Sequence, residues 1–190
     1  MQNAIILHGK ANHTKYYDSA FASPSNASWF PWIQKQLLMM EILAQTPEMP
    51  TPWKPEYSTW SREFERFSIT PETILVGHSF GAGFLVRWLS EHNNIRVGKV
   101  VLVAPWVDPD RTGGSGDFFD FAFDSSLPER TAKTIIFDSN DDFPGAQISA
   151  KMIREAIPGV SYREFDKYGH FTQITEFLEL RDELLQQLPK

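Results

Sequence analysis

The sequence predicts a single three-layer α/β/α domain, in which helices cover both faces of a mostly parallel sheet of about six strands. Short runs that are apolar at every position alternate with segments of helical periodicity, and this pattern is typical of a parallel sheet buried on both sides. The length of 190 residues fits one domain and leaves little for a second. Because the chain has no internal repeat, we assign residues 1–190 to one domain.

The expected strands are short, apolar and bounded by turn-forming residues. The clearest is the run Thr-Ile-Leu-Val at residues 73–76, which lies between Pro71 and Gly77. The other strands are expected at residues 4–7, 41–45, 99–104, 133–137 and 160–165.

Helices are expected where apolar residues return every three or four positions. These segments are residues 29–40, 57–67, 80–92, 146–157 and 171–188. A polar loop is expected to run to about residue 28, and residues 46–55 are expected to form a second loop because they include four prolines.

Residues 106–127 interrupt this alternation, because the segment is too long for a plain strand-to-helix connection. Its four phenylalanines argue against disorder. We expect a small lid over a pocket, and the alternative is a connection that simply packs on the core.

The composition narrows the range of partners. The net charge is −6 and the basic residues are scattered, so we expect no nucleic-acid partner. The absence of cysteine removes disulfides and thiolate metal sites. The first residues have no basic region before a short apolar run, and no run approaches the length of a membrane span. We therefore expect a cytoplasmic protein with no membrane partner.

The most informative motif is Gly-His-Ser-Phe-Gly at residues 77–81, which directly follows the clearest strand and precedes a predicted helix. This Gly-x-Ser-x-Gly pattern places a serine on a sharp turn between strand and helix, where only glycine fits on either side. The flanking elements are the context that gives the motif its meaning. We therefore predict that Ser79 is a nucleophile.

A serine nucleophile needs a base, which a carboxylate holds in place. His170 directly follows the last predicted strand, at the sheet edge where Ser79 is expected, and we predict that it is the general base. Three other histidines are expected to be structural. They are His13 in a polar loop, His78 within the motif and His92 at the far end of a helix.

Three aspartates near the end of the fifth strand could supply the carboxylate. Asp138 is closest to the strand and could face solvent or cap the loop, whereas Asp141 and Asp142 lie farther into the loop and could reach His170. Spacing alone does not separate them.

An oxyanion hole is expected from two backbone N–H groups. One should belong to Phe80, which follows the nucleophile. The other should come from the loop after the first strand, and we predict the backbone of Lys10.

From Ala4 to about Leu180, the sequence resembles the small serine hydrolases typified by retinoblastoma-binding protein 9, within the α/β-hydrolase superfamily. The resemblance is carried by the motif at 77–81, by Trp-Phe-Pro-Trp at 29–32, by Ser-Asn-Asp-Asp at 139–142 and by Gly-His-Phe at 169–171, followed by Thr-Glu-Phe at 175–177. It implies a minimal α/β-hydrolase fold. It also implies that Asp142 is the triad acid, with Asp141 as the second choice.

These features together predict a serine hydrolase that cleaves a small carboxylic ester or thioester through an acyl-enzyme. We expect Phe80 and the aromatic residues of the 106–127 segment to favour a modest apolar acyl group. We expect no cofactor and no metal. The alternative is a catalytically idle protein-interaction module on the same fold.

Overall fold

The computed structural model describes residues 2–186 and contains one six-stranded sheet in which every neighbouring pair of strands is parallel. The strands are β1 (Asn3–Leu7), β2 (Leu43–Gln45), β3 (Ile74–His78), β4 (Val97–Val103), β5 (Thr131–Ser139) and β6 (Ser161–Phe165). Their order across the sheet is β2-β1-β3-β4-β5-β6. The chain therefore leaves β1 toward one edge and then continues on the other side, which creates a topological switch point between β1 and β3.

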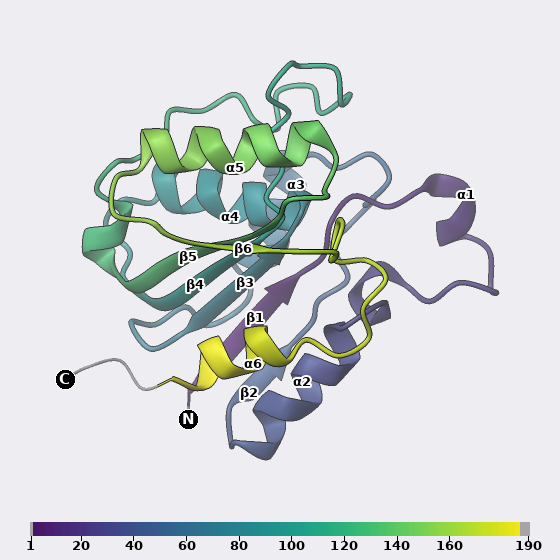
Figure 1. Ribbon diagram of the computed structural model, residues 1–190, viewed down its shortest axis with the longest axis horizontal. Coiled ribbons are helices and arrows are strands. Elements are labelled where there is room, and N and C mark those ends of the chain that lie inside the picture. Colours follow the sequence, from purple (N-terminus) through teal and green to yellow (C-terminus); the bar gives the residue numbers. More distant parts are fainter. Residues whose placement is uncertain (1, 187–190) are drawn as a thin grey trace.

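Helices cover both faces of the sheet, as the sequence predicted (Figure 1). They are α1 (His13–Tyr16), α2 (Phe30–Met39), α3 (Tyr57–Phe64), α4 (Phe80–Glu91), α5 (Pro144–Ala156) and α6 (Leu178–Leu185), together with 3-10 helices at Pro24–Asn26 and Leu127–Arg130. Helices α3, α4 and α5 lie on one face, and α2 and α6 lie on the other. The predicted fold class is therefore confirmed.

Each face of the sheet has its own apolar core, because the side chains of a strand alternate between the two faces. On the α3–α4–α5 face the largest buried rings come from the helices and include Trp60, Phe84 and Trp88. On the other face, Trp29 and Phe177 are fully buried between the sheet and the helices α2 and α6. The central strands β3 and β4 are buried at every position, so the sheet gives the site a rigid base.

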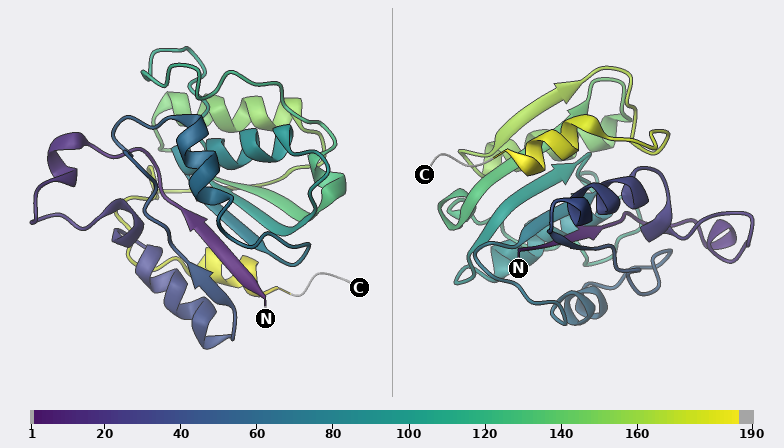
Figure 2. Two further views of the ribbon diagram at one scale, coloured as in Figure 1. Left: turned by 180° about the vertical axis from the view of Figure 1, so that it is seen from behind. Right: turned by 90° about the horizontal axis from the view of Figure 1, so that it is seen from below.

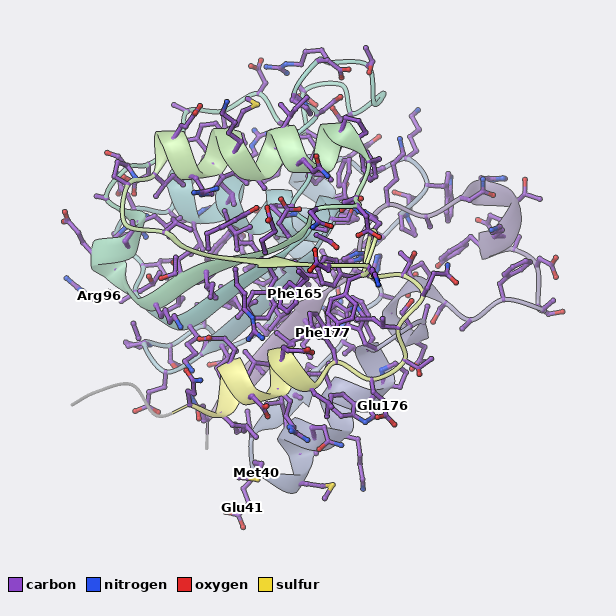
Figure 3. All side chains as sticks on the ribbon, in the orientation of Figure 1. Met40, Glu41, Arg96, Phe165, Glu176 and Phe177 are labelled. Atoms are coloured by element: carbon purple, nitrogen blue, oxygen red, sulfur yellow. The ribbon has the colours of Figure 1, made fainter. Side chains whose placement is uncertain are left out.

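The last helix is shorter than the periodicity predicted. It begins at Leu178 rather than at residue 171, and residue 188 of the expected range lies outside the described residues. Phe171 has a φ of 56°, which a right-handed helix does not allow. Instead of forming a helical stripe, the Phe171 and Phe177 rings both pack into the core, and Figure 3 shows Phe177 beside Phe165 of β6.

The loop expected up to residue 28 contains one turn of helix, α1, together with the 3-10 turn Pro24–Asn26. Asn12 caps α1 by accepting a hydrogen bond from the Lys15 N–H. None of the α1 residues is buried. Both views in Figure 2 show this part of the chain projecting from the body of the domain.

Residues 106–127 connect β4 to the 3-10 turn before β5, and their aromatic side chains face the core. Phe118 and Phe119 are buried, with ring centroids 4.4 and 4.6 Å from that of Phe80. In the same segment, Asp108 accepts hydrogen bonds from Gly113 and Ser115. The interpretation of this segment as a lid stays a prediction.

Across residues 2–186, no helix has the length and apolar character needed to cross a membrane.

Candidate active site

Ser79 lies on a strained turn at the switch point between β1 and β3. Its φ of 53° and ψ of −117° are unfavourable for a residue with a side chain, and they bring the serine to the end of β3 just before α4 begins. The turn is tightly held, because the Ser79 N–H donates to the Val103 carbonyl and the Ser79 carbonyl accepts from the Trp106 N–H.

The glycines of the motif are required by close backbone packing. A Cβ on Gly77 would lie 2.5 Å from the Ala82 Cα, and a Cβ on Gly81 would lie 2.4 Å from the His8 carbonyl oxygen. Both contacts are closer than real atoms allow. The elbow can therefore form only with glycine on both sides of the serine.

Three side chains from three different strand ends meet at the carboxyl edge of the sheet. Ser79 follows β3, Asp142 follows β5 and His170 follows β6. The Ser79 Oγ lies 2.8 Å from the His170 Nε2, and the His170 Nδ1 lies 2.8 and 3.1 Å from the two carboxylate oxygens of Asp142. Because Asp142 is buried while His170 is partly open to the cavity, the carboxylate can hold the imidazole without competition from water.

Asp141, the second choice for the carboxylate, is turned away from His170. Its Oδ1 accepts hydrogen bonds from the Ser139 hydroxyl at 2.6 Å and from the Gly169 N–H at 2.9 Å. These two donors hold the pKa of Asp141 below its usual range, the hydroxyl contributing most. These contacts connect the loop after β5 to the loop that carries His170, so Asp141 stabilises the packing of the two loops against each other.

Asp138 does not face solvent, although its place beside the predicted strand end allowed that role. The side chain is buried and accepts hydrogen bonds from the Ser139 N–H at 3.0 Å and from the Tyr162 hydroxyl at 3.2 Å. Burial raises the pKa of its carboxyl. The reason for this placement is that β5 continues two residues beyond the predicted end at residue 137, which keeps Asp138 inside the sheet.

His78 forms a hydrogen bond with the backbone of His170, the predicted base. Its Nε2 lies 2.8 Å from the carbonyl oxygen of His170, and its ring centroid lies 5.0 Å from that of His170. Since a carbonyl only accepts, the Nε2 carries the proton and donates it. Burial lowers the pKa of His78 to about 3, so the ring stays neutral near pH 7.

The two predicted oxyanion donors lie on opposite sides of Ser79. Phe80 is the first residue of α4, so its N–H belongs to the helical turn that has no acceptor within the helix. Lys10 follows the Gly9 turn after β1 and shares a cavity with Ser79. Within residues 2–186, the Lys10 backbone N–H makes no hydrogen bond.

His8 fixes the direction of the Lys10 N–H. The His8 Nε2 accepts from the Met49 N–H at 2.8 Å, so the proton is on Nδ1 and is donated to the Gly9 carbonyl at 2.7 Å. No peptide bond of the described residues is cis, and in a trans peptide the carbonyl and the N–H point in opposite directions. The Lys10 N–H therefore points away from the His8 ring. Burial also lowers the pKa of His8, which favours the neutral ring that this arrangement needs.

A cavity of about 410 Å³ opens beside Ser79 and His170. Its wall is formed mainly by the chain between β1 and α2, including Lys10, Lys15, Tyr16, Phe21, Ala22, Pro24, Ala27 and Phe30. The Phe80 ring packs instead against Trp60, Phe118 and Phe119 in the core. The apolar surface available to a ligand therefore comes from residues 21–30, and not from Phe80.

Sequence reasoning missed three kinds of site residue. Gly9 has the sequence signature of a simple turn, although a Cβ on it would lie 3.0 Å from the Ser79 Cβ. His78 is expected only to be structural, and its link to the His170 backbone cannot be read from spacing. The wall residues Lys15 and Phe21 lie in what looks like an ordinary polar loop, so nothing in the pattern directs them to the cavity.

The geometry of this site agrees with the known proteins that the chain resembles. The family model described as serine hydrolase matches residues 20–184. YdeN of Bacillus subtilis (strain 168), a provisionally named hydrolase, is 29% identical over 171 residues, which cover 87% of this chain and 89% of that protein.

Solved structures show the same fold. The crystal structure of the B. subtilis ydeN gene product covers 97% of both chains with a TM-score of 0.82 and 24% identity. Est1E from Butyrivibrio proteoclasticus covers 96% of this chain and 84% of its own, with a TM-score of 0.61 and 12% identity. The chain therefore has an α/β-hydrolase fold and belongs to the serine hydrolase family.

Proposed function

We propose that the protein hydrolyses a small carboxylic ester or thioester through an acyl-enzyme formed on Ser79. The observation that carries this proposal is the continuous hydrogen-bond relay from the Ser79 Oγ through both nitrogens of His170 to the buried carboxylate of Asp142. The same relay activates serine nucleophiles on unrelated folds, so its geometry supports the proposal independently of the family relationship.

In the first half of the reaction, the Ser79 Oγ attacks the carbonyl carbon and its proton passes to the His170 Nε2. The charge on the imidazolium is stabilised by Asp142. The carbonyl oxygen becomes an oxyanion, and in this proposal the backbone N–H groups of Phe80 and Lys10 bind it. The C–O or C–S bond then breaks, and the leaving alcohol or thiol takes the proton from Nε2.

The second half repeats these steps with water. His170 removes a proton from a water molecule, the hydroxide attacks the acyl carbon, and the Oγ of Ser79 leaves with the proton from Nε2. The carboxylic acid is released and the enzyme returns to its starting state. Every step of this sequence uses only groups of the chain, the ester and water.

Labelling with a fluorophosphonate probe tests the proposal. We expect the folded protein to be labelled at Ser79 and the Ser79→Ala variant to be unlabelled. 4-Nitrophenyl butyrate should be hydrolysed by the wild type before labelling, and neither by the labelled protein nor by Ser79→Ala. Ser58→Ala is a matched control, because Ser58 is exposed on α3. If the folded wild-type protein were neither labelled nor active, the proposal would fail and the idle interaction module would be the better description.

A further inference from the structure

The wall of the cavity beside Ser79 carries positive charge in a protein that is acidic as a whole. Lys10 and Lys15 both line the cavity, while no aspartate or glutamate is among its lining residues in the described chain. The net charge of the protein is −6. Two lysines in the wall of this cavity therefore contrast with the charge of the protein as a whole.

Neither lysine is neutralised by a neighbouring carboxylate. The Lys10 Nζ donates to the carbonyl oxygen of Gly113 at 3.1 Å, which leaves two of its three protons free, and the Lys15 Nζ lies 5.2 Å from the centre of the Phe21 ring. Over the described residues, neither Nζ lies within 4.0 Å of a carboxylate oxygen. Both ammonium groups are available to a ligand.

Within the wall segment, Asp18 accepts the Ala20 N–H at 2.9 Å and does not line the cavity. Glu48 is a second carboxylate close to this wall, and it is held behind it. One of its oxygens accepts the Ser25 N–H at 3.0 Å, and the other is buried 3.8 Å from the His8 Nε2. Glu48 does not line the cavity. Glu48 therefore stabilises the wall from the protein interior, and the surface that faces the cavity stays positively charged.

Much of the rest of the wall is apolar, namely Phe21, Ala22, Pro24, Ala27 and Phe30, and the polar side chains there are uncharged, such as Asn12, Ser28 and Thr172. A cavity of about 410 Å³ is within the usual range for a small organic ligand. A ligand that fits this surface has an apolar body that lies on these residues and an anionic end that reaches the lysines.

We propose that the substrate is an ester that carries an anionic group, a carboxylate or a phosphate, which Lys10 and Lys15 bind while its carbonyl carbon lies at Ser79. This inference rests on the proposed ester hydrolysis and specifies its substrate class. Because both lysines are exposed at the mouth of the cavity, the preference is moderate in size and sensitive to salt.

Matched esters of 4-nitrophenol test the preference. The adipate monoester ends in a carboxylate, the 6-phosphonohexanoate ends in a phosphonate, and the 6-methylheptanoate is a neutral chain of similar shape. We expect kcat/KM to be about two- to fivefold higher for one or both anionic esters, with the difference mainly in KM, because an exposed ion pair contributes only a small binding free energy. A second pair places the anion on the leaving group: 4-acetoxybenzoate carries a carboxylate there, and its methyl ester does not. The ratio of their kcat/KM values is measured in the same way.

Variants then assign the preference to the lysines. Lys15→Met and Lys10→Met keep most of the apolar stem and remove the charge, so each should lower the ratio of anionic to neutral kcat/KM, and the double variant should abolish it. Raising NaCl from about 20 mM to about 500 mM should also lower the ratio in the wild type. Lys35→Met, on the exposed side of α2, is the matched control and should leave the ratio unchanged.

The outcomes separate this inference from the proposed function. If the neutral esters are hydrolysed as well as the anionic ones in both series, or if the preference survives in the double variant, the inference is wrong while ester hydrolysis stands. If no ester is hydrolysed and Ser79 is not labelled, the proposed function itself is wrong.

Discussion

The Nε2 of His78 donates a hydrogen bond to the backbone carbonyl of His170, at 2.8 Å. The residue just before the nucleophile thereby holds the residue that we propose as its base, so the strand that delivers Ser79 also fixes the loop that delivers the imidazole. The contact joins positions 92 residues apart in the chain.

Replacing His78 should therefore affect turnover through the position of His170. We expect His78→Phe to lower kcat by about tenfold or more, since a small displacement of a catalytic group costs up to about a hundredfold. His78→Gln keeps an N–H donor and should recover part of the loss. Steady-state kinetics on 4-nitrophenyl butyrate, with near-UV circular dichroism to confirm folding, measure the effect. Equal kcat in both variants and the wild type would argue that the contact is only structural.

The buried histidines should make the fold sensitive to acid. The pKa of His78 falls from 6.5 to about 3 on folding, and that of His8 is also lowered, in both cases because burial disfavours the charged ring. For His78, the unfolded chain binds a proton between pH 6.5 and about 3 that the folded chain does not, so the free energy of unfolding decreases as the pH falls, by up to about 1.4 kcal/mol per pH unit. The lowered pKa of His8 changes the stability in the same direction.

Urea unfolding of the wild type and of His78→Gln at pH 7, 6 and 5 measures this difference. The wild type should lose stability more steeply than the variant below pH 6.5, while the two should run parallel above it. Carboxylates titrate in the same interval, and the comparison with His78→Gln cancels their contribution. Parallel curves throughout would contradict the prediction.

Two neighbouring aspartates should respond differently to the same substitution. Asp142→Asn removes the carboxylate that orients His170, and an amide can favour the wrong tautomer, so kcat should fall by about 10³–10⁴-fold with little change in KM. Asp141→Asn replaces the charged acceptor of the Ser139 and Gly169 hydrogen bonds with a neutral one, so it should lower Tm and reduce turnover much less.

Kinetics and thermal melts of both variants separate these roles. A larger loss of turnover in Asp141→Asn than in Asp142→Asn would move the catalytic role to Asp141.

Gly9 should be sensitive to the addition of a single methyl group. A Cβ there would lie 3.0 Å from the Ser79 Cβ and 3.5 Å from its Oγ, so alanine should push the nucleophile or the Lys10 backbone from its position. We expect Gly9→Ala to lower kcat by about ten- to a hundredfold while the protein stays folded.

The control is Gly114→Ala. That glycine has a φ of 66°, and a Cβ on it would meet no described atom within 4 Å, so alanine should reduce stability without reducing turnover. If Gly9→Ala kept full activity, the close approach to Ser79 would have no catalytic meaning.

The order of strands and helices could be predicted from the sequence because a parallel sheet leaves a simple pattern. Strands such as β3 and β4 are buried on both sides, so their residues are apolar at nearly every position. The pattern failed at the last helix because Phe171, Ile174 and Phe177 recur every three residues as in a helix, yet they pack on the core from a loop. The spacing of apolar residues indicates which side chains are buried, but it does not specify the backbone conformation of the segment that carries them.

The positions of Ser79 and His170 could be predicted because Ser79 directly follows β3 and His170 lies in the loop that follows β6, and parallel strands end at a common edge. The choice between Asp141 and Asp142 depends on side-chain directions within one short loop, which the order of residues does not encode. The cavity wall was missed for a different reason. Residues 10–30 have few regular hydrogen bonds and no periodic pattern, so their placement depends on tertiary contacts such as that between Lys10 and Gly113.

Residues 10–28, which form most of the cavity wall, are a single continuous excursion that contributes little to the core, since Ser25 alone among them is buried. The groups proposed to react are instead anchored at the ends of β3, β5 and β6. Under these proposals, the reacting side chains and the wall that contacts the substrate lie in separate stretches of sequence, and Lys10 alone belongs to both the wall and the oxyanion hole. Selection or engineering can therefore alter residues 10–28 to accept new esters at small cost to folding, and exchanging this one segment between relatives is a direct route to transferring their preferences.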